Sequence, residues 1–144
     1  MKTIELIFLE TDDSCSYCGF KHRENLSKHH IDGNPKNNNY DNLIVLCHNC
    51  HHRLTNNKGI CQKDIIKRKK NLIVKTLTQY GVNAIRLACR KNIIIPAIPF
   101  LVSHLIEMGY MKYTGPILYD VGIDYLAKFE LTPKGKILYD KWLK

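Results

Sequence analysis

The chain has 144 residues, of which 44% are hydrophobic and 24% charged, a composition typical of a globular protein. No window approaches the roughly 18 to 20 uninterrupted apolar residues of a membrane span, so we expect no membrane association. Residues 1–10 lack the basic start and long apolar run of a secretory signal, which predicts a reducing, cytoplasmic location. The 22 Lys and Arg exceed the 13 Asp and Glu and give a net charge of +9, which favours a polyanionic partner.

Periodicity and turn residues predict the first elements in chain order. Residues 27–34 have the pattern of a strand entering a turn, residues 40–46 that of a loop and a returning strand, and a helix starts at Cys50. From Cys61 to Tyr80 apolar residues recur at helical spacing with lysines on the other side, which predicts a long connecting helix. Gly81 is expected to end it as a C-cap residue, before a shorter helix over 82–91.

The remaining predicted elements are a helix, two strands and a last helix. A third helix is expected to start near Pro96 or Pro99 and to stop at Gly109. Two strands, 110–113 and 125–131, surround a loop that contains Gly115, Pro116 and Gly122, and Thr132 and Pro133 open a last helix to Leu143. The predicted fold class is α+β, divided into residues 1–58, a connecting helix over 59–80, and a mainly helical part over 81–144.

Four of the six cysteines form two Cys-x2-Cys pairs, Cys15 with Cys18 and Cys47 with Cys50, separated by 28 residues. This spacing is typical of four thiolates that bind one structural zinc, and a part this small needs such a stabilising element. Cys61 and Cys89 each stand alone on a helical apolar stripe and are predicted to be buried thiols.

Five of the seven histidines fall inside or beside the cysteine loop, at His29, His30, His48, His51 and His52. A His29-His30 pair, a central Asn42 before an apolar strand, and Cys-x2-Cys-His ending at His51 together resemble the HNH endonuclease family. The resemblance extends from Cys15 to about Asn57.

This resemblance implies a small zinc-bound ββα-metal (His-Me finger) unit. In such a unit His30 would be the general base, His29 and His51 would bind a catalytic divalent metal, and Asn42 would brace the loop that holds His30. A neutral imidazole can take the proton of an attacking water, while a cation offsets charge on the phosphate. Because adjacent strand residues point in opposite directions, we expect a twist or bulge at His29 and His30.

Two positions depart from the family pattern. Many relatives have Asp where this chain has His29, and an imidazole ligand favours zinc, nickel or manganese over magnesium, so the catalytic metal stays open among these four. Thr55 stands where some relatives have a further histidine. His48 and His52 are expected to be exposed, and Arg53 is either a phosphate contact or a plain surface residue.

The second half resembles a winged helix-turn-helix domain, because helices are followed by a predicted hairpin and the strand-to-helix junction Phe129-Glu130-Leu131-Thr132-Pro133. The resemblance implies a recognition helix over 96–108 that presents Ser103 and His104 to a DNA groove, and a wing whose Lys112 and Lys128 approach phosphates. Packing or dimerisation is the alternative use of this part.

Together these patterns predict a metal-dependent endonuclease that hydrolyses double-stranded DNA, with a structural zinc and one catalytic metal ion. The alternatives are a non-catalytic zinc-containing transcriptional regulator that binds DNA and, more remotely, an RNA-cleaving enzyme. The oligomeric state stays open, a homodimer included.

Overall fold

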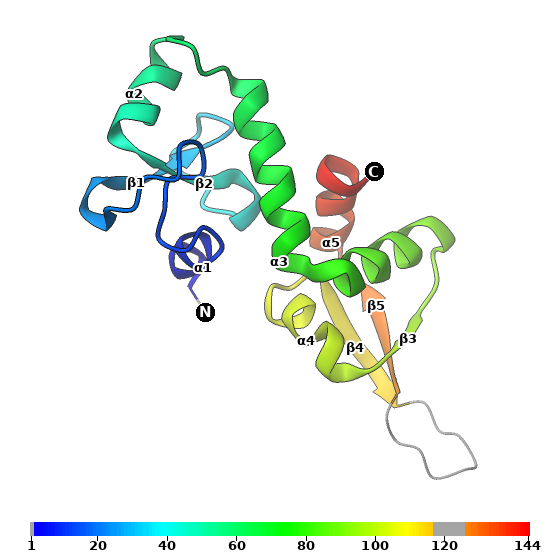
Figure 1. Cartoon of the computed structure of the whole chain (residues 1–144). Coiled ribbons are helices and arrows are strands. Elements are labelled where there is room, and N and C mark those ends of the chain that lie inside the picture. The colour runs from blue at the N-terminus through cyan, green and yellow to red at the C-terminus, as the bar shows by residue number, and fades with distance from the viewer. Residues whose placement is uncertain (1, 117–125) are drawn as a thin grey trace. The chain divides into compact units, whose positions relative to one another are not determined.

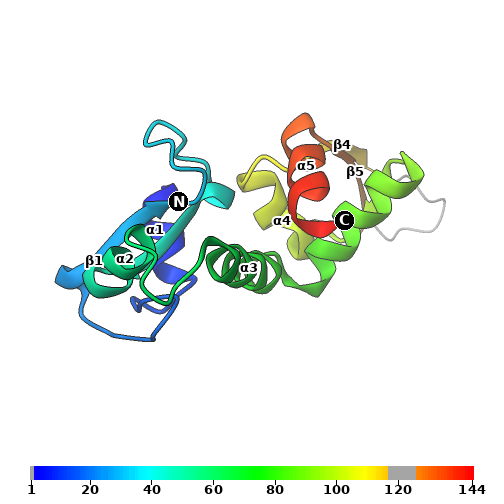
Figure 2. The same cartoon turned by 90° about the horizontal axis from the view of Figure 1, so that it is seen from above.

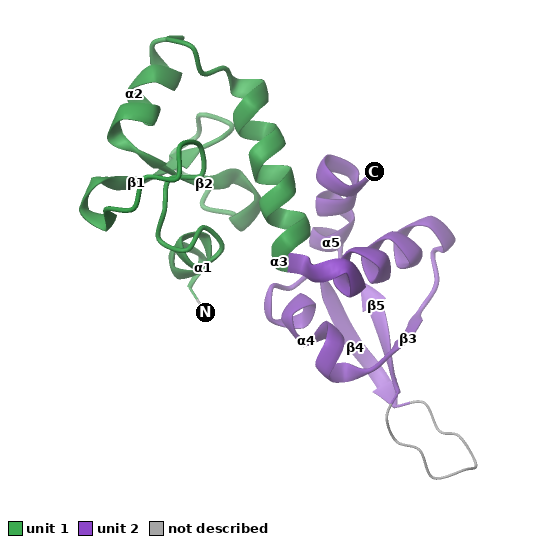
Figure 3. Ribbon diagram, in the orientation of Figure 1, with its two compact units in different colours: residues 1–76 green, residues 77–144 purple. Residues whose placement is uncertain are grey.

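The structure is a computed structural model that describes residues 2–116 and 126–144, seen from two directions in Figures 1 and 2. The described residues form helices and two short antiparallel sheets, so the predicted α+β class is confirmed. The chain forms two compact units, residues 1–76 and 77–144 (Figure 3). No helix in the described part of the chain is long and apolar enough to cross a membrane.

The first unit contains a two-stranded hairpin and its covering helices. Its elements are α1 (Thr3–Leu9), β1 (Leu26–His30), β2 (Leu43–Cys47), α2 (His48–Thr55) and the first part of α3 (Gln62–Lys91). Single 3-10 turns at Arg23–Asn25 and Tyr40–Asn42 precede the two strands. Helix α1 is not among the elements predicted from the sequence.

The hairpin has an unbroken antiparallel register, from Leu26 opposite Cys47 to His30 opposite Leu43. All five residues of β2 are buried, because α1 and α2 both contact this strand from opposite sides of the hairpin (Figure 1). A strand covered on both faces needs a continuous apolar run rather than an alternating one, and Leu43-Ile44-Val45-Leu46 supplies it.

Helix α2 begins at His48, earlier than the start at Cys50 predicted from the sequence. Cys47 is its N-cap, and its Sγ accepts a hydrogen bond from the backbone N–H of Cys50 at 3.4 Å. The sequence did not indicate Cys47 as the N-cap, because a thiol is not among the usual capping side chains.

A buried ion pair joins three segments of the first unit. The side chains of Glu10 and Lys69 are both 0% exposed, and Lys69 Nζ lies 2.7 Å from Glu10 Oε1. The second carboxylate oxygen, Oε2, accepts hydrogen bonds from Tyr40 at 2.5 Å and Thr76 at 3.3 Å. The Lys69 ammonium also lies 3.8 Å from the centre of the Tyr40 ring. The Glu10 carboxylate thus joins the segment after α1 to the turn before β2 and to helix α3.

Helix α3 is interrupted at Thr78, whose φ of 60° and ψ of 166° are not helical. The sequence predicted a break at Gly81, but Gly81 lies inside the helical part that follows. Thr78 begins that part like an N-cap residue, since its Oγ1 accepts from Gly81 N at 3.4 Å. Packing explains the glycine at position 81 instead, because a Cβ there would lie 2.8 Å from His104 Nε2.

The second unit packs helices against a three-stranded antiparallel sheet. Its elements are the end of α3, β3 (Ile95–Ala97), α4 (Pro99–Glu107), β4 (Met111–Pro116), β5 (Ala127–Leu131) and α5 (Pro133–Leu138), with a final π-helical turn over Tyr139–Leu143. The strand order is β3-β5-β4. Pro96 therefore lies in a strand that the sequence did not predict, and the helix starts at Pro99. The predicted strand start at Tyr125, and Gly122, lie outside the described residues.

The last helix begins as predicted. Thr132 is its N-cap, with Oγ1 accepting from Gly135 N at 3.1 Å and donating to Gly109 O at 2.6 Å. Gly135 allows the close approach of the two segments, because a Cβ there would meet the Tyr110 carbonyl oxygen at 2.2 Å. One threonine thus caps α5 and joins it to the turn after α4.

The buried ion pair generates a stability prediction. Glu10→Gln leaves the Lys69 ammonium buried without a counter-charge, so we expect the free energy of unfolding to fall by about 3–5 kcal/mol in urea denaturation. Asp12→Asn is the matched control: it breaks the exposed Lys21–Asp12 pair and should leave the urea midpoint nearly unchanged. The double variant Glu10→Leu with Lys69→Met should recover part of the loss. Equal midpoints for Glu10→Gln and Asp12→Asn would contradict this account.

Candidate functional site

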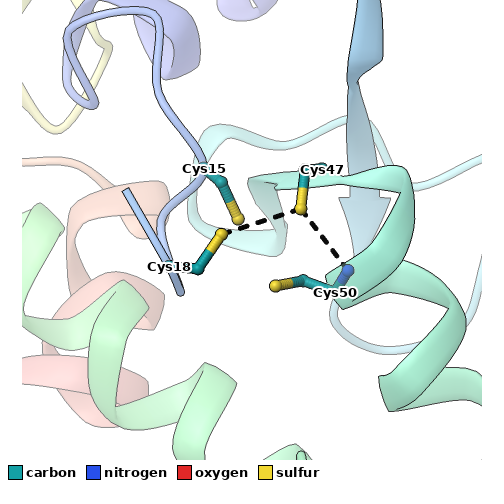
Figure 4. Close-up of side chains that lie close together, drawn as sticks. All are labelled: Cys15, Cys18, Cys47 and Cys50. Carbon is teal, nitrogen blue, oxygen red and sulfur yellow. Dashed lines mark hydrogen bonds between the residues drawn. The ribbon is translucent and has the colours of Figure 1, made fainter. Parts of the chain in front are cut away.

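The four paired cysteines converge in the first unit. Cys15 and Cys18 come from the loop after α1, Cys47 from the end of β2 and Cys50 from α2, and their sulfur atoms point toward one another (Figure 4). All four Sγ atoms lie within 4.8 Å of one another, and Cys18 Sγ is 3.7 Å from Cys47 Sγ. The loop, the strand and the helix therefore meet at one cluster.

The thiols of this cluster have different proton affinities. Burial acts to raise the pKa of Cys15, but the backbone N–H groups of Cys18, Cys47 and Tyr17 outweigh it and lower that pKa to about 7. Burial raises the pKa of Cys47 and of Cys50. Clustered thiolates repel one another, so all four would be ionised together only around a bound cation.

The geometry fits a tetrahedral metal ion. Metal–sulfur bonds of about 2.3 Å, the zinc value, place tetrahedral sulfur atoms about 3.8 Å apart. The 3.7 Å between Cys18 and Cys47 matches this spacing. The part of the cysteine prediction that concerns their convergence is confirmed, and these four residues could hold a metal ion.

The two unpaired cysteines do not join this cluster. Cys61 is exposed just before α3, where its N–H and Sγ both donate to Asp64 Oδ2, so the prediction that it is buried was wrong. Helix α3 begins at Gln62, so Cys61 precedes the helix and does not lie on its apolar side. Cys89 is half-buried in the second unit, with Sγ 3.3 Å from Lys136 Nζ.

His29 and His51 meet at the face of the hairpin that α2 covers. Their ring centroids are 5.0 Å apart with the planes at 67°, and both side chains are half-buried. Burial, together with the neighbouring His51 and His30 rings, lowers the pKa of His29 to about 4. His29 is therefore neutral near pH 7, and a neutral imidazole has the lone pair that a metal ligand needs.

His30 extends from β1 in a different direction. Asn38 Oδ1 accepts from His30 Nε2 at 3.2 Å and from Lys28 Nζ at 3.0 Å. Lys28 and His30 therefore share one face of β1, as strand alternation requires, while His29 lies on the other. We expected a twist or a bulge at His29 and His30, and the register with β2 is continuous there, so β1 has no bulge at these residues. With its proton on Nε2, a neutral His30 keeps Nδ1 as its acceptor.

Asn42 closes the loop that follows His30. It is 0% exposed, its Oδ1 accepts from Asp32 N at 3.0 Å, and its Nδ2 donates to Asp32 Oδ1 at 2.8 Å and to Asn37 O at 3.0 Å. Its backbone carbonyl also accepts from Ile31 N at 2.9 Å. One buried amide thus connects both ends and the middle of the 31–42 loop.

The other predicted residues of the first unit have structural contacts or face solvent. Arg53 is half-buried and donates from Nε to the Lys58 carbonyl at 3.1 Å, so it stabilises the turn after α2. His48 and His52 are exposed, as expected. Thr55 donates to the His51 carbonyl at 2.8 Å.

In the second unit the four residues predicted to contact DNA differ in their exposure and in their contacts. Ser103 and Lys128 are exposed. His104 is half-buried, with Nε2 at 2.8 Å from the Leu77 carbonyl, so its side chain contacts α3 and does not lie on the exposed side of α4 with Ser103. The apolar periodicity did not show that α3 approaches this side of α4. Lys112 forms a cross-strand ion pair with Glu130 at 3.1 Å.

Sequence reasoning missed Asn38, the residue that contacts His30. It lies in a run of asparagines at 37–39, where composition indicates a loop but nothing singles out one amide. The i, i+2 spacing of Lys28 and His30 was the available signal of a shared acceptor, because it places two donors on one face of the strand.

Comparison of the chain with family models, with curated proteins and with solved structures finds no match.

The cysteine cluster generates a metal prediction. Elemental analysis of the purified protein should find one thiolate-bound metal ion per chain, and Cys50→Ser should lose it and unfold the first unit, as monitored by circular dichroism. Cys61→Ser and Cys89→Ser are matched controls that should keep the metal. Full metal content in Cys50→Ser, or metal loss in both controls, would show that the ion binds elsewhere.

Proposed function

We propose that this protein is a metal-dependent HNH endonuclease that hydrolyses DNA phosphodiester bonds. The observation that carries the proposal is the arrangement at the end of β1. His29 meets His51 of α2 on one side, His30 is oriented by Asn38 on the other, and Asn42 braces the intervening loop.

Two metal ions have separate roles in this proposal. Cys15, Cys18, Cys47 and Cys50 hold a structural zinc, because four thiolates form a closed tetrahedral site. His29 and His51 hold a catalytic divalent ion, which offsets the negative charge that develops on the phosphate and on the leaving 3′-oxygen. Imidazole ligands favour zinc, nickel or manganese over magnesium at this second site.

His30 acts on the water. Its Nδ1 accepts a proton as the water oxygen bonds to phosphorus, and the bond from phosphorus to the 3′-oxygen breaks. The Asn38 amide fixes the Nε2–H tautomer and the ring orientation, so Nδ1 is the nitrogen that remains basic. Asn42 is a positioning residue, since it holds the loop that carries Asn38 and contacts no reacting atom.

The second unit is proposed to be a winged-helix domain that contributes to DNA binding. The strand order β3-β5-β4 and the placement of α4 before the β4–β5 pair support this assignment. Helix α4 contains neither Lys nor Arg, and its exposed residues include Phe100, Ser103 and Ile106. Its contacts with DNA would therefore depend on Ser103 and on the exposed Lys128 of β5 rather than on a basic helix face.

The histidine arrangement generates an activity prediction. His30→Ala should reduce nicking of supercoiled plasmid by about 10²–10⁴-fold, with DNA affinity nearly unchanged, because the base acts on water and adds little to binding. His52→Ala, on the exposed side of α2, is the matched control and should cut at the parent rate.

His51→Ala separates the role of a metal ligand from that of a base. If His51 binds metal, raised manganese or nickel concentration should restore part of the lost rate, whereas His30→Ala should not respond. Parent-level cutting by His30→Ala would exclude the assigned base. A parent that binds DNA but cuts it with none of the four metals would favour the DNA-binding regulator, and a parent that cuts only RNA would favour the RNA-cleaving enzyme.

A further inference from the structure

The net charge of the first unit is concentrated on one helical segment. Residues 1–61 contain seven Lys and Arg against seven Asp and Glu, whereas Gln62–Thr76 of α3 contains six against one. Of these six cations only Lys69 is buried, where it pairs with Glu10. The exposed cations of the segment are Lys63, Lys67, Arg68, Lys70 and Lys75.

Lys63, Lys67 and Lys70 form one row along this segment. Residues three and four apart are neighbours on a helix, and each such step advances about 4.5–6 Å along the axis. The three side chains therefore lie on the solvent side, while Ile65, Lys69 and Ile73 are 0% exposed on the inner side. We call this row the α3 basic face.

The row costs stability within the protein. Like charges at these spacings destabilise a helix by about 0.2–0.5 kcal/mol per pair. Within residues 2–116 and 126–144, none of the three lysines lies within 4.0 Å of a carboxylate. Other exposed lysines do have such a partner, for example Lys21 with Asp12 and Lys112 with Glu130. Among the described residues these three charges thus form no ion pair.

The segment is firmly attached beside the cysteine cluster. Arg68 donates from Nη1 to the Ser16 carbonyl at 3.0 Å, and its guanidinium lies 4.4 Å from the centre of the Tyr17 ring. Ser16 and Tyr17 are the two residues between Cys15 and Cys18. Next to this contact Tyr17, Asp64, Lys67, Arg68 and Asn71 line a recess of about 310 Å³. Gln62, at the start of α3, also donates to the Ile31 carbonyl just after His30.

We propose that the α3 basic face binds the phosphate backbone of duplex DNA. A rigid row of ammonium groups, none of them within 4.0 Å of a carboxylate among the described residues, is complementary to a line of phosphates, and each phosphate it neutralises releases condensed counterions. The face contacts backbone rather than bases, so it adds affinity without sequence preference. This inference rests on the proposed function for the identity of the polyanion, and it assigns the main electrostatic contact to the first unit.

The test compares two triple variants of equal charge in the full chain. K63Q/K67Q/K70Q removes the face, and K2Q/K91Q/K144Q removes three exposed lysines elsewhere. Binding to a fluorescein-labelled DNA duplex of arbitrary sequence is followed by anisotropy at several KCl concentrations, with no divalent metal added. The face variant should bind at least about tenfold more weakly at moderate salt, and its plot of log affinity against log salt should be shallower by about 2–3.

The control variant should bind within about twofold of the parent, and K63R/K67R/K70R should keep the parental salt slope because it keeps the charges. Circular dichroism confirms folding of each variant. Equal losses in the two glutamine triples would show a net-charge effect and overturn the proposal, as would a parental slope in the face variant. Loss of binding to anionic lipid vesicles with unchanged DNA binding would assign the face to membranes instead.

Failure of this inference is distinguishable from failure of the proposed function. If the parent shows the steep slope but never cleaves DNA, hydrolysis is wrong and the DNA-binding face stands. If the parent cleaves DNA and K63Q/K67Q/K70Q binds like the parent, hydrolysis stands and the face is not the contact.

Discussion

The contact between Glu10 and Lys69 is the constraint on which the first unit depends. Removing two charges from water costs several kcal/mol per ion, and only close pairing with further hydrogen bonds offsets that cost. Burial lowers the pKa of Lys69, while the Glu10 carboxylate acts against it. Tyr40 and Thr76 satisfy the remaining oxygen of Glu10. The end of α1, the turn before β2 and the middle of α3 must therefore come together for any of these groups to be buried.

This constraint leads directly to the candidate site. Tyr40, which donates to Glu10, lies in the same 3-10 turn as Asn42, and Asn42 closes the loop that orients Asn38. The side chain facing His30 is thus connected through the turn to a buried ion pair. A loop rich in asparagine would otherwise have few apolar contacts to fix its conformation, so a rigid attachment at its end matters for the geometry at His30.

Helix α3 has different residues on its two faces. Its inner residues, Ile65 and Ile73, belong to the core, and Lys69 provides the charge that Glu10 needs. Its outer residues provide the positive charge that the rest of the first unit lacks. A helix can separate such roles because residues three and four apart share a face while their neighbours turn away. In the proposed enzyme the same helix both stabilises the hydrolytic unit and holds the substrate.

The sequence by itself determined the local features whose cause is local. The Thr132-Pro133 pair predicted the start of the last helix, because capping depends on a few adjacent residues. The spacing within each Cys-x2-Cys pair is equally local, and two such pairs predicted the convergence of Cys15 and Cys50 because one tetrahedral metal site takes four thiolates. The apolar run before Cys47 likewise predicted a strand.

Other contacts between distant segments were decided only by the tertiary structure. The contact of His30 with Asn38, the burial of Lys69 and the turn of His104 toward Leu77 each depend on which elements pack together. Periodicity shows that a residue lies on a face, but not what covers that face. A run of lysines looks the same in the sequence whether one of them is buried or all are exposed. The carboxylate that allows Lys69 to be buried belongs to Glu10, 59 positions away along the chain.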